Sequence, residues 1–148
     1  MMNRRTFVKQ SCMACIGLGV GMLLLDSCQT VKYSTGTMAG NKLTVPLSEF
    51  TITDKNGVQS TRHYIIVKHD SLQYPICVYR FSPTEFKSIW LRCSHQGAEL
   101  QVSGDTLVCQ AHGSEFDNKG HVTNGPADKD LRTFETHADD QFINIALK

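Results

Sequence analysis

Two short segments in the second half of the chain contain side chains that bind metals. The first contains Cys93 and His95, and the second contains Cys109 and His112. A glycine stands close behind each histidine, which indicates a tight turn, and the two segments together supply two thiolates and two imidazoles. This ligand set suits a [2Fe–2S] centre in which two histidines replace two cysteines on one iron. The sequence therefore predicts a protein that moves electrons.

A tetrahedral zinc site is the alternative, because two cysteines and two histidines are also a common set of zinc ligands. Zinc fingers usually place both cysteines before both histidines, with the histidines on a helix. Here cysteine and histidine alternate, as C-x-H and C-x-x-H, and thirteen residues separate His95 from Cys109. Order and spacing favour two facing loops around an iron–sulfur cluster over a structural zinc site.

The two segments resemble the cluster loops of the Rieske [2Fe–2S] proteins, whose signature is C-x-H, a spacer and then C-x-x-H-G. The likeness continues through Ser114 and residues 125–127 (Gly-Pro-Ala), and it extends to the Rieske subunits of quinol-oxidising cytochrome bc complexes. It implies one [2Fe–2S] cluster, with the two cysteines on the inner iron and the two histidines on the outer, more exposed iron. In the family, the proline segment covers the cluster and limits the access of water.

The charge of the ligands gives a reason for histidine. Two thiolates and two neutral imidazoles leave the oxidised site neutral, whereas four thiolates would leave it doubly negative. A neutral site accepts an electron more easily, so the reduction potential rises into a window of roughly −150 to +300 mV, against about −400 mV for all-thiolate plant-type clusters.

The chain departs from the bc-type subunits beside the ligands. Those subunits carry an extra cysteine in each loop, and the two cysteines form a disulfide, whereas this chain has Ala98 and Ala111 at those places. The resemblance implies that the Ser114 hydroxyl donates to a bridging sulfide, and it places Phe116 where high-potential members have a tyrosine. The hydrogen bond of the Ser114 hydroxyl, which raises the reduction potential, is kept, whereas that of the tyrosine hydroxyl is missing. We therefore expect a potential below that of quinol-oxidising Rieske proteins.

The N-terminal end has the pattern of an export signal. Residues 3–9 (N-R-R-T-F-V-K) resemble the twin-arginine motif R-R-x-F-x-K, and an apolar run follows from Cys12 to Leu25. As a helix this run of fourteen residues is about 21 Å long, which is short for a hydrocarbon layer of roughly 30 Å. We expect residues 1–27 to be a twin-arginine, lipoprotein-type signal peptide. Twin-arginine export carries folded proteins, so the cluster could be built first.

Residues 25–28 (L-D-S-C) resemble a bacterial lipobox, although Asp26 is unusual there, and Cys28 is the candidate lipidation site. The alternatives are cleavage near Ser27 by an ordinary signal peptidase, or retention of the segment as an uncleaved anchor. Each predicts a domain in the bacterial cell envelope that faces the periplasm. Residues 28–41, rich in Ser, Thr and Gly, are expected to be a flexible tether.

The remaining residues, 42–148, have the size of one domain. Short segments rich in β-branched and aromatic residues alternate with turn signals, so we expect an all-β, Rieske-like antiparallel sandwich or small barrel. The cluster-binding subdomain is expected at about residues 92–131, and a single turn of helix at residues 83–86. The predicted strands are Leu43–Phe50, Arg62–Lys68, Pro75–Phe81, Ser88–Cys93, Ala98–Val102, Thr106–Cys109 and Gln141–Leu147.

The net charge is +1 and no basic stripe is present, so nucleic-acid binding is not indicated. The leading hypothesis is one-electron transfer by an exported, membrane-tethered subunit of a quinol-linked respiratory chain, rather than an enzyme by itself. Its redox partners would be a cytochrome or a quinol-oxidising membrane subunit. The alternatives are a ferredoxin-type electron donor to an oxygenase, which the missing disulfide would suit, and a structural zinc-binding lipoprotein.

Overall fold

The structure is a computed structural model that describes residues 31–148. The predicted signal peptide, residues 1–27, and the candidate lipidation site Cys28 lie outside the described residues. The described residues contain no α-helix, and their one helical element is the 3-10 turn η1 (Leu47–Phe50). The expected all-β architecture is confirmed. Within the described part, no helix is long and apolar enough to span a bilayer.

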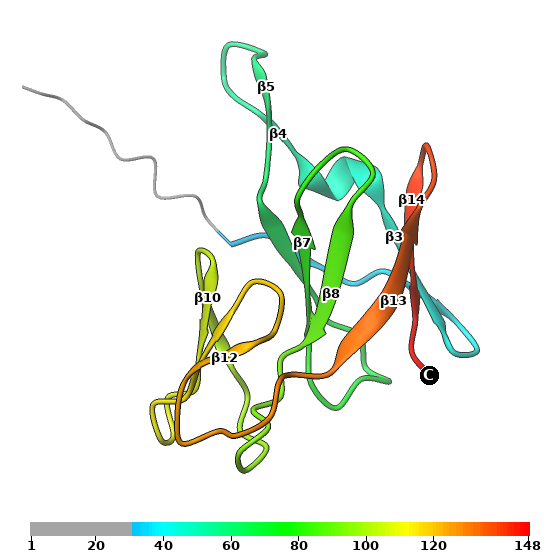
Figure 1. Ribbon diagram of the computed structural model, residues 1–148. Helices are drawn as coiled ribbons and strands as arrows, with labels where there is room; N and C mark the ends of the chain where they lie inside the picture. The colour runs from blue at the N-terminus through cyan, green and yellow to red at the C-terminus, as the bar shows by residue number, and fades with distance from the viewer. Residues whose placement is uncertain (1–30) are drawn as a thin grey trace, which may run out of the picture. The chain divides into compact units, whose positions relative to one another are not determined.

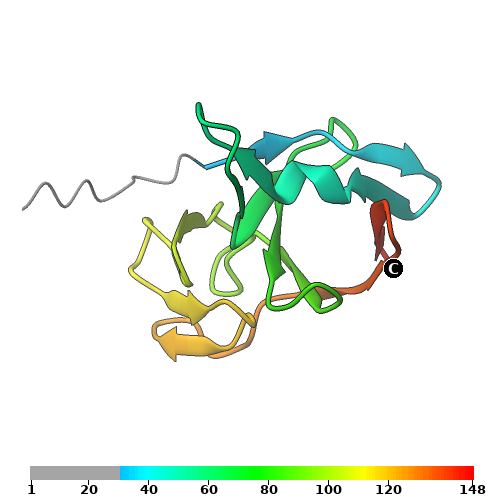
Figure 2. The same cartoon turned by 90° about the horizontal axis from the view of Figure 1, so that it is seen from above.

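Eight strands form a sheet that curls on itself, in the order β1-β6-β7-β8-β13-β14-β3-β2 (Figures 1 and 2). All neighbouring strands in it are antiparallel, except that β1 runs parallel to β6. Its strands are β1 (Tyr33–Ser34), β2 (Thr37–Ala39), β3 (Lys42–Pro46), β6 (Tyr64–Val67), β7 (Ile76–Arg80), β8 (Phe86–Trp90), β13 (Thr133–Ala138) and β14 (Phe142–Ala146).

A second, four-stranded antiparallel sheet lies in the expected cluster-binding subdomain, in the order β12-β11-β10-β9. In Figure 1 it lies beside the large sheet, at the lower left. Its strands are β9 (Gln101–Ser103), β10 (Thr106–Val108), β11 (Glu115–Asp117) and β12 (Val122–Asn124). A separate hairpin is formed by β4 (Thr51–Thr53) and β5 (Gln59–Thr61).

Strand β7 divides the interior into two cores, because successive side chains of a strand point to opposite faces. Ile76 and Val78 pack into the core of the large sheet, whereas Cys77 and Tyr79 pack into the core beneath the small sheet. All four side chains are buried. A strand that is buried on both faces has a continuous apolar sequence, which is why this strand was predictable.

Two local predictions were wrong. The strand expected over Leu43–Phe50 ends at Pro46, and the chain turns through η1 so that Phe50 becomes fully buried. The helical turn expected at residues 83–86 is absent. There the hydroxyl of Ser82 accepts the N–H groups of Thr84 and Glu85, and this side-chain cap replaces a helix before β8 begins.

The described part of the expected tether belongs to the sheet. Strand β1 pairs with β6, and β2 pairs with β3. Ser34 is buried, and Gly36, with φ of 63°, allows the chain to pass close to Leu43. Ser, Thr and Gly in this short segment do not indicate a strand. Its backbone N–H and C=O groups nevertheless find hydrogen-bond partners because the segment pairs with the edges of the sheet. Residues 33–39 therefore add to the domain.

Candidate metal centre

The first predicted ligand pair lies in a six-residue loop, Cys93–Ala98. The N–H of Cys93 donates to the carbonyl oxygen of Ala98 at 2.8 Å, and the N–H of Gly97 donates to the carbonyl oxygen of Cys93 at 2.9 Å. Gly97 has a φ of 76°, in the left-handed region that glycine adopts without a Cβ clash. The loop is closed on itself and holds Cys93 and His95 on one turn.

The second loop, Cys109–Ser114, repeats this hydrogen-bond pattern between β10 and β11. The N–H of Cys109 donates to the carbonyl oxygen of Ser114 at 2.8 Å, and the N–H of Gly113 donates to that of Cys109 at 2.9 Å. Gly113 has a φ of 77°. The two loops therefore share one backbone frame, although histidine follows cysteine by two residues in the first loop and by three in the second.

The structure brings the two histidines together. Their ring centroids lie 5.0 Å apart, with an angle of 85° between the ring planes. His95 is half-buried and His112 is exposed, whereas Cys93 and Cys109 are each 1% exposed and belong to the same core cluster. Sulfur donors lie inside and imidazole donors lie toward the surface. This order matches the inner and outer irons that the resemblance implies.

The surroundings of the Nδ1 atom of His95 show whether these residues fit a metal. It is buried and has no hydrogen-bond partner among the described residues. Most buried polar side-chain atoms have a partner, so an exception needs an explanation, and an ion that occupies the lone pair is one. Neutral imidazole nitrogens are common metal ligands. No three His, Cys, Asp or Glu side chains within residues 31–148 are grouped to hold a single metal ion.

The proline segment, residues 125–127, and the preceding Asn124 are hydrogen-bonded to the second loop. The N–H of Ala127 donates to Oγ of Ser114 at 3.0 Å, and the side-chain amide of Asn124 donates to the carbonyl oxygen of Gly113 at 3.2 Å. Ser114 is fully buried. Its oxygen accepts this hydrogen bond, so its hydroxyl hydrogen stays available for another acceptor.

Three contacts that no sequence motif indicates support the first loop. The hydroxyl of Tyr74 donates to the carbonyl oxygen of Gly97 at 2.6 Å, and Oγ of Ser94 donates to that of Lys129 at 2.5 Å. The guanidinium of Arg92 lies against Gly97, where an added Cβ would be 3.0 Å from its Nη2 atom. Tyr74 is 23 residues from Gly97. Only the fold brings these groups together, so no sequence motif indicates them.

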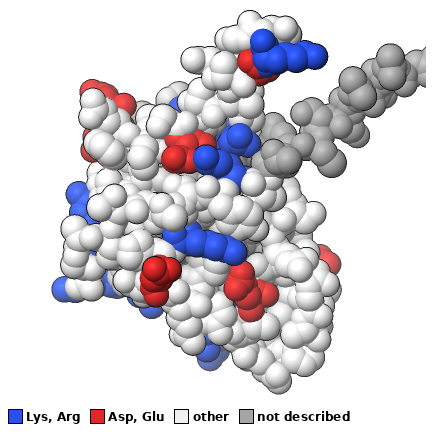
Figure 3. All heavy atoms as spheres, turned by 180° about the vertical axis from the view of Figure 1, so that it is seen from behind, with Lys and Arg blue, Asp and Glu red and all other residues white. Residues whose placement is uncertain are grey.

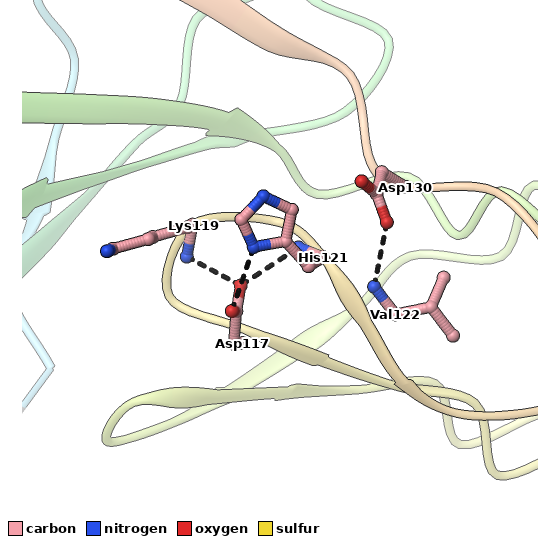
Figure 4. A network of polar contacts seen from close by, with 5 residues as sticks. All are labelled: Asp117, Lys119, His121, Val122 and Asp130. Atoms are coloured by element: carbon pink, nitrogen blue, oxygen red, sulfur yellow. Dashed lines mark hydrogen bonds and ion pairs between the residues drawn. The ribbon is translucent and has the colours of Figure 1, made fainter.

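The remaining chemically active side chains lie elsewhere. Cys77 is fully buried in β7, and burial raises the pKa of its thiol far above the ordinary value, so it stays protonated. His121 lies in the β11–β12 turn, where its Nδ1 is 3.1 Å from Oδ2 of Asp117 (Figure 4). His137 is exposed and 3.0 Å from Glu135. In the view of Figure 3, side chains of both charge signs are interspersed.

Asp117 holds the β11–β12 turn. Its Oδ1 accepts the N–H groups of Lys119 and His121, both at 2.8 Å (Figure 4). Partial burial alone would raise the pKa of Asp117, but these hydrogen bonds and the His121 ring outweigh it, and the pKa lies below its ordinary value. Asp130 accepts the N–H of Val122 at 2.9 Å on the far side of the hairpin. This network fixes the small sheet that carries the second loop.

The comparison with protein families identifies the class of this protein. The family model of the Rieske [2Fe-2S] domain matches residues 50–135, which include both loops and the proline segment. The chain belongs to this family. A Rieske domain binds one [2Fe–2S] cluster and transfers electrons through it, so the predicted cofactor and electron-transfer chemistry are confirmed.

Solved structures of other proteins are similar to this chain, and one of them, CntA, supports the same fold. The plasma membrane Rieske protein PetC3 from Synechocystis PCC 6803 is 24% identical, with 56% of this chain and 85% of that chain covered and a TM-score of 0.48. The complex of reduced oxygenase and oxidized ferredoxin in carbazole 1,9a-dioxygenase is 24% identical, with 57% of this chain and 81% of that chain covered and a TM-score of 0.45. The quaternary ammonium Rieske monooxygenase CntA is 15% identical, with 73% of this chain and 33% of that chain covered and a TM-score of 0.53. This chain therefore corresponds to a third of that enzyme. No curated protein sequence matches the chain.

Proposed function

We propose that Cys93, His95, Cys109 and His112 hold the [2Fe–2S] cluster of an exported, membrane-tethered one-electron carrier. The observation that carries the ligand assignment is the pair of matching loops, which sort two buried sulfurs inside and two adjacent imidazoles outside. The unpartnered, buried Nδ1 of His95 supports the same assignment. When bound, the cluster supplies a centre that gains and loses one electron.

Each residue of the site has a separate role in this proposal. The buried cysteines keep water from the inner end, and the exposed ring of His112 gives a redox partner the shortest approach to the site. Ser114, held by Ala127, keeps its hydroxyl hydrogen for an acceptor at the site, which favours the reduced state. The proline segment is hydrogen-bonded to Ser114 and, through Asn124, to Gly113, and in this proposal it shields the buried Ser114 end of the second loop from solvent.

The partner is proposed to be a cytochrome or a quinol-oxidising membrane subunit of a respiratory chain. The twin-arginine pattern and the lipobox of the N-terminal segment support a periplasm-facing domain that is anchored at Cys28. A ferredoxin-type donor to an oxygenase is the second candidate, and Ala98 and Ala111 favour it because they remove the disulfide that quinol-oxidising members carry.

Anaerobic purification tests the ligand assignment. Iron and sulfide analysis should give two of each per chain, and the reduced protein should have the paramagnetic resonance spectrum of a mixed cysteine and histidine site. Cys93→Ala and Cys109→Ala should lose the cluster. Cys77→Ala is the matched control, because Cys77 is equally buried but lies in β7, and it should keep the cluster. A colourless protein that contains zinc would overturn the proposal.

Cell fractionation tests the location and the anchor. The full chain should be found in the membrane fraction with its domain accessible to protease from the periplasm, and fatty-acid labelling should depend on Cys28. Arg4→Lys combined with Arg5→Lys should leave the protein in the cytoplasm. Cytoplasmic protein in the wild type would favour the ferredoxin-type donor instead. Purification of the membrane-bound form with its partners, followed by mass spectrometry, identifies the redox partner.

A further inference from the structure

We propose that the positive charge of Arg92 raises the reduction potential of the centre. This inference rests on the proposed ligands, and it adds a residue that lies outside the ligand set and the Ser114 hydrogen bond. Arg92 precedes Cys93, and its guanidinium lies on the first loop against Gly97. The charge is therefore fixed beside the loop that carries two of the four ligands.

Two contacts fix the position of this guanidinium. Its central carbon lies 5.5 Å from the centroid of the Trp90 ring, in a cation–π arrangement. A Cβ at Gly97 would lie 3.0 Å from its Nη2 and 3.2 Å from its Nε. Only glycine lets a planar guanidinium approach the loop backbone so closely. Tyr74, edge-on to Trp90 with centroids 5.5 Å apart, fixes the ring that Arg92 packs on.

The charge of Arg92 is not neutralised by a local ion pair. The ion pairs within residues 31–148 join Lys32 to Glu49, His121 to Asp117 and His137 to Glu135, and none includes Arg92. Glu99 is paired with Arg92 in a backbone bridge, but its carboxylate makes no ion pair with the guanidinium. The positive charge therefore acts on its surroundings, although solvent weakens it because Arg92 is exposed.

The sign of the effect follows from electrostatics. Reduction adds one negative charge to the centre, and a fixed positive charge nearby stabilises the reduced form more than the oxidised form. Arg92 thus acts in the same direction as the Ser114 hydroxyl, from the opposite loop. It offsets part of the effect of Phe116, which lacks the tyrosine hydroxyl of high-potential relatives.

The chain offers a matched control in Arg132. Its guanidinium packs on the same indole as that of Arg92, with its central carbon 5.6 Å from the Trp90 centroid, but it also lies over Phe134 and donates to the carbonyl oxygen of Leu147. Among the contacts of the described residues, it has none with the first loop. Loss of either arginine removes one charge and one cation–π contact with Trp90, and only Arg92 lies against Gly97.

Redox titration of the purified protein, with paramagnetic resonance to verify the cluster, tests this proposal. Arg92→Gln should lower the midpoint potential, Arg132→Gln should lower it less, and Arg92→Lys should stay close to the wild type. The difference between wild type and Arg92→Gln should shrink as ionic strength rises. Equal shifts in Arg92→Gln and Arg132→Gln, or a shift in Arg92→Lys as large as in Arg92→Gln, would overturn the role of the charge.

If Arg92→Gln does not retain the cluster, Arg92→Met, which keeps an unbranched chain without charge, takes its place. If both uncharged variants lose the cluster while Arg92→Lys keeps it, the salt dependence decides. The wild-type potential must then fall with increasing ionic strength, and a constant potential would overturn the proposal. Failure of the proposed ligand set can be told apart from failure of this proposal. In that case the wild type itself would lack the paramagnetic resonance spectrum of a mixed cysteine and histidine cluster.

Discussion

Ser114 and Ala127 are joined by a hydrogen bond of 3.0 Å, in which the backbone N–H of Ala127 donates to the Oγ of Ser114. Both residues are buried, and they lie on two different segments, the second loop and the proline segment. The bond orients the serine hydroxyl and ties the proline segment to the second loop. In the proposed site, the Ser114 side chain therefore has two functions: its hydroxyl favours the reduced state, and its oxygen holds the proline segment.

Ser114→Ala should therefore change two properties together. The N–H of Ala127 would lose its acceptor in a buried position, which costs about 1–3 kcal/mol of stability. The reduction potential should fall, because the hydroxyl no longer favours the reduced state. Urea denaturation and redox titration measure the two effects. Ser103→Ala, at an exposed serine in β9, should change neither.

Phe116→Tyr should raise the reduction potential. Phe116 is fully buried in β11 and packs in the core cluster that contains Cys93 and Cys109. A hydroxyl there would restore the hydrogen-bond donor that the resemblance assigns to high-potential members. Redox titration checks the direction. An unchanged potential with an intact spectrum would mean that the hydroxyl does not reach a cysteine sulfur in this chain.

His112→Cys should lower the potential in the fraction of protein that retains a cluster. A thiolate in place of a neutral imidazole adds one negative charge to the site and disfavours the gain of an electron. His121→Gln, at a histidine held by Asp117 away from the ligand set, should leave the potential unchanged. The charge argument is wrong if the cysteine variant keeps the wild-type potential.

Gly97→Ala should destabilise the protein more than Gly113→Ala. The two glycines have φ of 76° and 77°, so alanine pays a similar backbone cost of about 1–2 kcal/mol at each position. A Cβ at Gly113 meets open space, whereas one at Gly97 would press on the guanidinium of Arg92. Urea denaturation of the two variants compares them directly. Equal losses would show that Arg92 moves away without cost.

Asp117→Asn should weaken the dependence of stability on pH in acid. The pKa of Asp117 in the folded protein is below the ordinary 3.8, so the unfolded chain binds the proton more tightly. Its contribution is fully present above the ordinary pKa and is lost as pH falls through the lower folded value. Urea midpoints measured from pH 6 down into this acidic range check the expectation. Asp140→Asn, at an exposed aspartate without a side-chain hydrogen bond in the described part, is the control.

The two closed loops that carry the proposed ligands were predictable because the spacing of their residues is local. Cys93 to His95 and Cys109 to His112 each fit within one closed turn, and a short motif contains all of that information. Strand β7 was predictable for a related reason, since burial on both faces requires an unbroken apolar run. Strand β13, with Phe134 as its one large buried side chain, has no such signal and was missed.

The supports of the site could not be predicted in this way. Tyr74 reaches Gly97 through the tertiary fold and Arg92 through the closure of the first loop, and neither stands in a pattern that distinguishes it from an ordinary strand or loop residue. The strand in residues 37–39 is of the same kind, because its pairing with β3 depends on the position of the sheet edge, and its three residues, Thr-Met-Ala, are too few to give a strand signal.

The contacts that hold the two loops within the described residues include no disulfide, so they need no oxidant to form and no reductant breaks them. Within the described residues, Cys77, Cys93 and Cys109 form no disulfide, and the loops are held by the hydrogen bonds of Tyr74, Asn124 and Ser114. Such a domain can complete its folding in the reducing compartment where iron and sulfide are supplied. It also keeps its closure in the presence of thiols such as glutathione, which would open a disulfide-clamped relative.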